Sequence, residues 1–436
     1  MKLDMELPLS ADSRSIWQLI VRFYRRTISS DFVQKVAETF VTKVAMIGIG
    51  LVTSVIVARS LGPEGRGLYA VAATIGAIGV QSGNLGLHAS NTYYAARDRT
   101  LLPALVGNSI VVSFGFGTIG IAFIWFLFFF WPSLAPVHGL LLILSLIWIP
   151  FGLGYMLLQN LLLGIQEVRN YNKIELATKI LGVSLLGLVI FLVNITVEKV
   201  FLAGLVALVI GFVWAFWRMK IYLVKAALPS LTLFKENIYY GLKAYLAAFF
   251  AFLVIRVDIL MVKYMLGAEQ TGYYSVAASM AEMVYILPVV VGTILFPKLS
   301  ALSDIKEKWY LTKKVAVGSV FGMIPVLAMA GFLAKPIVTV LYGKAFLPSV
   351  SAFFWLSPGI LFLGVETVAV QFVNSIGFPI TVVMVWILAS LLNVGLNMWA
   401  IPVYGIVGAS MVSSLSYFVL FVLVIWVSRF TRLKHE

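Results

Sequence analysis

Long apolar stretches separated by short polar segments recur along almost the whole chain. Twelve of them are long enough to form helical spans, at roughly 36–58, 68–91, 105–130, 140–163, 174–194, 200–222, 240–264, 273–296, 315–334, 350–372, 379–400 and 405–427. A bilayer core of about 30 Å needs about 20 apolar residues per helix. Polar and apolar residues do not alternate with a period of two, which disfavours a membrane β-barrel. The pattern therefore predicts an all-α polytopic membrane protein with about 12 transmembrane helices.

The composition excludes most soluble classes of protein. Of the 436 residues, 61% are hydrophobic and 11% are charged, whereas soluble domains average about 45–50% and about 25%. A soluble enzyme, a nucleic-acid binder and a disordered chain are therefore disfavoured. The chain has no cysteine, so disulfides and thiolate chemistry are absent. It has three histidines and no HExxH-like cluster, so no metal site is predicted.

The basic residues predict how the chain is oriented in the membrane. Lys and Arg number 32 against 18 Asp and Glu, a net charge of +14. With the N-terminus inside, 21 cations fall on the inner side and 6 on the outer side, namely Arg59, Arg66, Lys199, Lys263, Lys335 and Lys344. Because cytoplasmic loops carry an excess of Lys and Arg, both termini are predicted to be cytoplasmic, and no nucleic-acid partner is needed.

The basic segment Arg14–Arg26 precedes the first span. Apolar residues recur in it at helical spacing, namely Ile16, Leu19, Ile20 and Phe23. It has two interpretations: an amphipathic helix lying on the inner leaflet, or a positive tail that only fixes the topology.

A motif in the first half of the chain recurs in the second half. LGPEGRGLYAVAAT (Leu61–Thr74) and LGAEQTGYYSVAAS (Leu266–Ser279) match at eight of fourteen positions, at a constant offset of 205 residues. The glycines suit a tight turn and close helix packing, so a structural role is favoured. Six spans per half is an even number, so the repeat is parallel. The interface between the halves is then the expected substrate path.

The repeat predicts five parts of the chain. A cytoplasmic tail over 1–35 leads into an N-terminal six-helix lobe over 36–222. A basic cytoplasmic linker over 223–239 joins it to a C-terminal six-helix lobe over 240–427, and a second cytoplasmic tail follows over 428–436.

A few charged residues lie within predicted spans, where a charge is costly and is therefore a functional hypothesis. Arg256 and Asp258 lie in the seventh span, and two helical residues apart they face different directions. Each therefore needs its own partner, which is another helix, a cavity or an anionic ligand. Glu282 and Glu366 are isolated acids in the eighth and tenth spans. They are candidates to carry a coupling proton or cation, or to pair with Arg256.

Lys43 is a further cation within a span, the first one. It has two interpretations, because a lysine near a helix end can extend to the interface or bind an anion. In the fifth span, Glu175 and Lys179 have the favourable i,i+4 order and are predicted to pair with each other.

Two spans carry polar stripes. Spacings of three, four and three place four residues of the second span on one helix face, namely Gln81, Asn84, His88 and Asn91. The eleventh span repeats the pattern with Ser390, Asn393 and Asn397. Such a stripe must face protein or water. It supplies either hydrogen bonds between helices or the lining of a cavity for sugar or phosphate groups.

Two segments resemble a known family. Ala58–Ala73 (ARSLGPEGRGLYAVAA) and Asn374–Ser410 (NSIGFPI…LLNVGLNMWAIPVYGIVGAS) resemble polysaccharide flippases of the Wzx type, within the multidrug/oligosaccharidyl-lipid/polysaccharide exporter (MOP) superfamily. The resemblance implies a bacterial inner-membrane protein with a V-shaped pair of lobes and a cationic cavity. Its implied cargo is an undecaprenyl-pyrophosphate-linked oligosaccharide, an O-antigen, capsule or exopolysaccharide unit, carried to the outer leaflet by alternating access. It also implies coupling to H⁺ or Na⁺, no cofactor, and glycosyltransferases or glycan polymerases as partners.

The charged and polar residues within the spans suit this substrate. A pyrophosphate needs cations, for which Arg256 and Lys43 are the candidates. Sugar hydroxyls need mixed donors and acceptors, for which the candidates are Gln81, Asn84, His88, Asn91, Asn393 and Asn397. The candidates for ion coupling are Asp258, Glu282 and Glu366.

Three alternatives predict different features. A multidrug exporter of the same superfamily needs an anionic cavity for cationic drugs, whereas the charges within these spans are mixed. A membrane glycan polymerase or ligase needs a sizeable outer loop with acids for chemistry, and the longest predicted outer loop, around Ala334–Ser349, has no carboxylate. No enzyme activity is therefore predicted. A purely structural scaffold does not explain the polar stripes.

Overall fold

The computed structural model describes residues 31–192, 194–223, 226–377 and 379–435, so the segment Arg14–Arg26 lies outside the described residues. The described residues form helices joined by short turns, without strands. The α-helices are α2 (Asp31–Gly83), α3 (Leu87–Arg97), α4 (Leu102–Ile110), α5 (Gly117–Phe130), α6 (Gly139–Gly164), α7 (Val168–Leu192), α8 (Val197–Lys220), α9 (Leu231–Leu266), α10 (Ala268–Ala301), α11 (Ile305–Phe332), α12 (Ala334–Ile337), α13 (Ser349–Asn374) and α14 (Ile380–His435). Short 3₁₀ or π segments are η1 (Arg99–Leu101), η2 (Val111–Phe116), η3 (Pro132–Leu134), η4 (Val338–Tyr342) and η5 (Lys344–Phe346).

The predicted number of spans is confirmed. Within the described residues, ten helical segments are long and apolar enough to cross a membrane. Two of them lie in α2 and α14, which have 53 and 56 residues and are interrupted by non-helical glycines, Gly62 and Gly405. An unbroken helix of that length would extend about 80 Å, more than twice the thickness of a bilayer core. Each therefore folds back at its glycine into two spans, which gives twelve.

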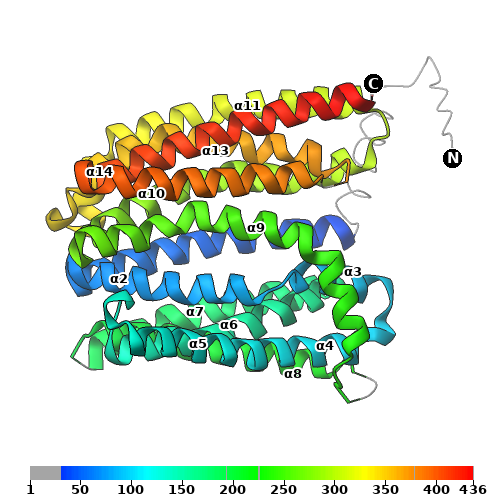
Figure 1. The fold of residues 1–436 in the computed structure, drawn as a ribbon, viewed down its shortest axis with the longest axis horizontal. Coiled ribbons are helices and arrows are strands. Elements are labelled where there is room, and N and C mark those ends of the chain that lie inside the picture. The colour runs from blue at the N-terminus through cyan, green and yellow to red at the C-terminus, as the bar shows by residue number, and fades with distance from the viewer. Residues whose placement is uncertain (1–30, 193, 224–225, 378, 436) are drawn as a thin grey trace, which may run out of the picture.

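The spans form two lobes that lie side by side (Figure 1). We call α2–α8 the first lobe and α9–α14 the second lobe. In Figure 1, α10, α11, α13 and α14 lie in the upper half and α5–α8 in the lower half, with α2 and α9 between them. The largest buried apolar cluster fills the second lobe and continues into the facing sides of α2 and α6, through residues such as Val71 and Leu141.

The repeated motif forms the contact between the lobes at one end of the molecule. A Cβ atom on Gly67 would lie 1.8 Å from the carbonyl oxygen of Ala268, and one on Gly272 would lie 1.9 Å from that of Pro63. Residues 63 and 268, and residues 67 and 272, are pairs at the offset of 205. The two contacts are therefore the same contact made twice, as across a two-fold axis. We call it the lobe seal.

Two side-chain hydrogen-bonding contacts also join the lobes near the lobe seal. Arg59 of α2 donates from Nε to the carbonyl of Leu341 in the second lobe at 2.7 Å, and from Nη2 to that of Val340. Tyr264 of α9 donates to the carbonyl of Leu134 in the first lobe. Arg59 and Tyr264 are again 205 residues apart, so the donors of these two contacts occupy equivalent positions of the repeat.

The helix α9 starts earlier than the sequence predicts and is attached to both lobes. It begins at Leu231, within the segment 223–239 predicted as a linker. Asn108 of α4 donates to the carbonyl of Ser230 at 3.0 Å and accepts from its backbone N–H at 2.8 Å. The first turns of α9 run beside α3 (Figure 1). There Tyr240 stacks on Tyr93 with ring centroids 4.3 Å apart.

Candidate functional site

A pocket lies between the lobes, next to the lobe seal. Its volume is about 240 Å³. The first lobe lines it with Arg66, Tyr69, Ala70, Ala73, Thr74 and Ala77 of α2, and the second lobe with Phe252, Arg256 and Ile259 of α9 and Ser275, Ala278 and Ser279 of α10. Because the two lobes each supply one wall, a change in the angle between them would open or close this pocket.

Arg66 is the buried cation of the pocket. From the sequence it counts among the cations of the outer side and is not a candidate site residue, but the side chain is only 7% exposed and lines the pocket. Its Nη2 donates to Ser54 and, across the lobe interface, to Ser279, both at 3.2 Å. Its Nε has no hydrogen-bond partner among the described residues, and no carboxylate there lies within ion-pair distance.

Arg66 had a signal in the sequence. It stands directly before Gly67 in the repeated motif, where the second copy has Thr271. Gly67 of the first copy and Gly272 of the second copy both form the lobe seal. At the position before this glycine the two copies differ, because the first has a cation and the second a threonine. The two lobes therefore differ chemically at equivalent positions beside the lobe seal.

Arg256 is the second cation of the pocket, and it comes from the other lobe. Its Nη2 lies 3.0 Å from Oε1 of Glu282 on α10, which confirms the pairing considered from the sequence. The Arg256 and Glu282 side chains are 35% and 40% exposed. Arg256 therefore keeps donors available for a ligand while Glu282 holds its position.

The remaining lining of the pocket suits a polar ligand with flat apolar faces. Tyr69 and Phe252 contribute aromatic rings, and the Arg66 guanidinium lies 5.9 Å from the ring centroid of Tyr69. Thr74, Ser275 and Ser279 contribute hydroxyl groups. Hydroxyls both donate and accept hydrogen bonds, whereas the two guanidinium groups only donate, so the lining offers donors suited to an anion beside groups suited to neutral polar atoms.

Lys43 lies elsewhere, and the expectation that it joins Arg256 in one anion site is wrong for this structure. Its Nζ lies 2.9 Å from Oε1 and 3.0 Å from Oε2 of Glu175, and 3.3 Å from the Tyr171 hydroxyl, in the seam between α2 and α7. Glu175 therefore pairs with Lys43, and the predicted pair with Lys179 is also corrected. The i,i+4 spacing considers only partners on the same helix, whereas the partner of Glu175 lies on a neighbouring helix.

The four polar residues of the second span do not share one helix. The helix α2 ends at Gly83, a turn follows with Leu85 and Gly86 at positive φ, and α3 starts at Leu87. Asn84 accepts from the backbone N–H of His88 at 3.1 Å, and its Nδ2 lies 2.6 Å from His88 Nδ1. Asn91 donates to Ser109 of α4 at 2.9 Å. These contacts, with Gln81 at the end of α2, fix the turn and pack the first lobe, and none of the four residues lines the pocket.

Asn393 and Asn397 likewise lie outside the pocket. Asn397 donates to Asn393 at 3.0 Å, and Asn393 donates to Ser416 at 3.3 Å. These hydrogen bonds join the two parts of α14 that lie before and after Gly405. Both asparagines are fully buried. Of the two interpretations of this stripe, hydrogen bonding between helices is the one that the geometry matches.

The acids Asp258 and Glu366 are buried inside the second lobe rather than in the pocket. Asp258 accepts hydrogen bonds from the Tyr274 hydroxyl, from Ser413 at 3.1 Å and from its neighbour's backbone N–H, as expected for a residue facing away from Arg256. Glu366 is 1% exposed, and its Oε1 has no partner among the described residues.

Comparison with known proteins places the chain in a family. Residues 56–351, more than half of the chain, match the family described as polysaccharide biosynthesis protein. The uncharacterized membrane protein MJ1068 of Methanocaldococcus jannaschii is 23% identical over 278 residues, which cover 61% of this chain. The match spans 55% of that protein, so the chain covers about half the length of this relative.

Solved structures share the fold. An inward closed lipid II flippase MurJ matches with a TM-score of 0.69 at 17% identity, covering 91% of this chain and 87% of the flippase. An inward-facing multidrug resistance MATE family transporter of the MOP superfamily matches with a TM-score of 0.71 at 15% identity, covering 95% and 98%. A MOP superfamily transporter from Pyrococcus furiosus, whose binding pocket is described as reversed in polarity, matches with a TM-score of 0.64 at 16% identity, covering 91% and 95%. This multi-pass membrane chain therefore belongs to the polysaccharide biosynthesis protein family and has the fold of MOP superfamily transporters.

Proposed function

We propose that this protein is a flippase that carries an undecaprenyl-pyrophosphate-linked oligosaccharide, a unit of O-antigen, capsule or exopolysaccharide, across a bacterial inner membrane. The pyrophosphate binds in the pocket between Arg66 and Arg256, and the first sugars bind the adjoining aromatic rings and hydroxyls. Glycosyltransferases supply the substrate, and a glycan polymerase consumes it. The chain itself has no enzyme activity.

The observation that carries this proposal is Arg66. A buried guanidinium without a counterion is costly, and an unmade hydrogen bond at a buried charged donor adds to the cost. Among the described residues, the partners of its Nη2 are two neutral hydroxyls, and its Nε has none. An anionic ligand compensates this charge, and Arg256 provides a second fork of donors from the opposite lobe.

The lobe seal supports transport by alternating access. It closes the pocket at the end where Gly62 and Gly267 turn the chain, which is the outer face if the excess of Lys and Arg lies in the cytoplasm. In that orientation both termini are cytoplasmic. The substrate headgroup then enters from the cytoplasmic leaflet, and rocking of the lobes separates the lobe seal and releases the headgroup outside.

The buried acids Asp258 and Glu366 are the candidates for coupling this motion to H⁺ or Na⁺. Both are buried in the second lobe, and Glu366 has a carboxylate oxygen without a partner among the described residues. Glu282 does not line the pocket and forms an ion pair with Arg256, which does. It therefore positions the cation instead of carrying the ion.

The test is flipping by the purified chain in proteoliposomes. A fluorescent undecaprenyl-pyrophosphate sugar is incorporated, and its appearance in the outer leaflet is followed with an enzyme that acts on exposed sugars only. Arg66→Gln and Arg256→Gln should each lower the initial rate about tenfold or more, because each removes a charge-assisted contact of roughly 1.5–3 kcal/mol. Arg429→Gln, which changes an exposed arginine at the end of α14, should leave the rate unchanged.

The same vesicles distinguish the multidrug exporter. A cationic fluorescent drug is supplied with H⁺ or Na⁺ gradients in place of the lipid-linked sugar. Two guanidinium groups at the pocket repel such a drug, so no gradient-driven transport is expected. Drug transport together with absent flipping would overturn the proposed substrate.

A further inference from the structure

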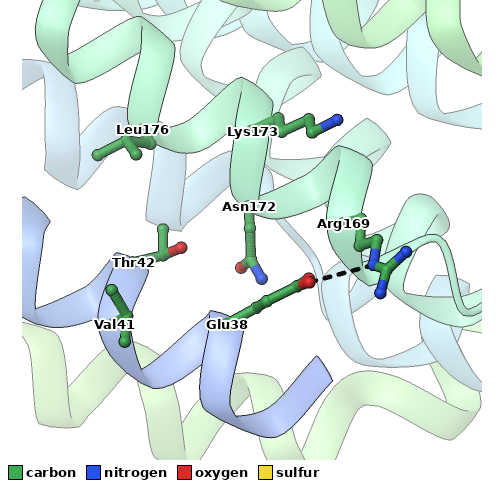
Figure 2. A pocket seen from close by; sticks show the side chains of 7 residues that line it. All are labelled: Glu38, Val41, Thr42, Arg169, Asn172, Lys173 and Leu176. Atoms are coloured by element: carbon green, nitrogen blue, oxygen red, sulfur yellow. Dashed lines mark ion pairs between the residues drawn. The ribbon is translucent and has the colours of Figure 1, made fainter. Parts of the chain in front are cut away.

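A second cavity lies between α2 and α7 (Figure 2). Its volume is about 790 Å³, and it shares no lining residue with the pocket between the lobes. Glu38 and Thr42 of α2 line one wall, and Arg169, Asn172 and Lys173 of α7 line the other. Nothing in the transport cycle described above uses these residues.

The cavity lies at the depth of lipid headgroups. Thr42 and Glu38 precede Gly62 by 20 and 24 residues of helix, a rise of about 30 and 36 Å. Because a hydrocarbon core is about 30 Å thick, the cavity lies at the headgroup level of the leaflet opposite the lobe seal. Exposed apolar side chains continue along both helices from there, including Val44 and Val52 of α2 and Ile180 of α7. A lipid headgroup in the cavity would therefore leave its acyl chains on an apolar surface.

The walls of the cavity are held together by contacts between the two helices. Arg169 Nε lies 3.2 Å from Glu38 Oε1, as the dashed line in Figure 2 marks. Asn172 Nδ2 donates to Thr39 at 3.0 Å. The ion pair of Lys43 with α7 follows one turn deeper in the membrane. The cavity is therefore pre-formed and does not depend on a ligand to bring α2 and α7 together.

Two side chains of the cavity, Asn172 and Lys173, have polar groups that a ligand could bind. Asn172 is only 5% exposed, and its Oδ1 acceptor has no hydrogen-bond partner among the described residues. Figure 2 shows its amide between the two helices, above Glu38. Lys173 is exposed, and no ion pair joins it to the described carboxylates. A matching ligand has an anionic group for Lys173 and a hydrogen-bond donor for Asn172.

We propose that this cavity binds the headgroup of a phospholipid whose phosphodiester also carries a hydroxyl or ammonium group. Lys173 and Arg169 hold the phosphate, and the hydroxyl or ammonium group donates to Asn172 Oδ1. Phosphatidylglycerol and phosphatidylethanolamine have both features. Phosphatidylcholine has the phosphate but no donor, so it satisfies Lys173 and leaves Asn172 unpaired. The site is separate from the transport pocket and stands whether or not the protein flips a glycan.

Native mass spectrometry of the full chain, released from detergent micelles, tests this directly. Phosphatidylglycerol, phosphatidylethanolamine and phosphatidylcholine with the same acyl chains are titrated one at a time, and the bound fraction is measured. The first two should bind about tenfold more tightly than phosphatidylcholine, the effect of one buried acceptor satisfied or left unpaired. Glycerol phosphate at the same concentrations tests a soluble phosphate source, and it should not compete.

Two variants separate the two contacts. Lys173→Gln should weaken all three lipids by about tenfold, and Asn172→Ala should remove the preference over phosphatidylcholine while leaving phosphatidylcholine binding unchanged. Lys306→Gln is the matched control, since Lys306 is an exposed lysine at the start of α11 in the other lobe. Equal binding of the three lipids by the unaltered chain, or equal effects of Lys173→Gln and Lys306→Gln, would overturn the proposal. Competition by glycerol phosphate would overturn the lipid source.

Discussion

Arg66 and Arg256 approach one pocket from opposite lobes, yet they differ in their partners. Arg256 has a carboxylate at 3.0 Å, whereas Arg66 has hydroxyl partners and an unpaired Nε. An arginine that forms an ion pair with a carboxylate can be explained by a structural role alone, without a ligand. The interpretation of Arg256 as a ligand-binding residue therefore needs an experiment that separates it from a structural ion pair.

Exchanging the charges of Arg256 and Glu282 distinguishes ligand binding by Arg256 from a purely structural ion pair. In the double variant Arg256→Glu with Glu282→Arg, a purely structural ion pair is re-formed and flipping should return to near the original rate. If Arg256 binds the pyrophosphate, the exchanged protein folds but flips at least tenfold more slowly, which is the result we expect. The measurement is the proteoliposome rate, with the thermal midpoint as the control for folding.

Asp258 gives a second prediction at this scale. In Asp258→Ala the hydroxyls of Tyr274 and Ser413 lose a buried acceptor, which costs roughly 1–3 kcal/mol. The thermal midpoint should fall by about 2–4 °C for each kcal/mol in a lobe of about 200 residues. Asp258→Asn keeps one carbonyl acceptor, which can serve the two hydroxyls bonded to Oδ2 but not also the backbone N–H bonded to Oδ1, and should lower the midpoint less than Asp258→Ala does.

Transport by Asp258→Asn then tests coupling separately from stability. If Asp258 carries the coupling ion, this variant flips lipid-linked sugar at the same rate with and without an imposed H⁺ or Na⁺ gradient. A response to the gradient equal to that of the unaltered chain would rule Asp258 out and leave Glu366 as the candidate acid.

At the scale of elements, the repeated Leu-Gly turn explains both the break between consecutive spans and the approach of the lobes. Gly62 and Gly267 have φ of 67° and 90°, a region that glycine adopts at no steric cost. One turn further on, Gly67 and Gly272 lie directly against carbonyl oxygens of the other lobe. The first glycine of each motif turns the chain, and the second one permits the lobe seal.

Gly67→Ala should therefore prevent the lobe seal from forming. The added Cβ would lie 1.8 Å from a carbonyl oxygen of the second lobe, and overpacking of this kind costs typically 1–3 kcal/mol. The fraction of molecules closed at this end should fall about tenfold. It is measured from the distribution of distances between two spin labels placed across the interface. Gly48→Ala in the same helix, where a Cβ meets nothing within 4 Å, should behave like the unaltered chain.

At the scale of the whole molecule, closure at the lobe seal uses equivalent contacts from both lobes. Arg59 and Tyr264 occupy equivalent positions, and each one donates to a carbonyl in the opposite lobe, in η4 or η3 respectively. The chain has no cysteine, so introduced cysteines react without a background from native thiols.

Cross-linking should trap the closed state. A short reagent with two reducible thiol-reactive ends should join Arg59→Cys to Leu341→Cys, and Tyr264→Cys to Leu134→Cys, with similar yields. Either cross-link should abolish flipping, and cleavage of the cross-link by reduction should restore it. Each single-cysteine variant treated with the same reagent is the control. Full flipping by the cross-linked protein would show that this end does not open during transport.

The sequence by itself determined the membrane class, the twelve spans and the two related halves. These depend on local hydrophobicity and on a motif that is read along one dimension, and the structure confirms them. The helix break after Gly83 was not predicted, because the polar spacing of the second span fits an unbroken helix and the turn depends on the contacts of Asn84 and Asn91 with other segments.

Only the tertiary structure decided which charged side chains share a site. Lys43 and Glu175 lie 132 residues apart in the chain and form an ion pair, and Arg66 reaches Ser279 across 213 residues. An α-helix fixes which of its own residues share a face, but the neighbour of that face depends on how twelve spans pack. That packing moved Lys43 out of the candidate site and brought Arg66 into it.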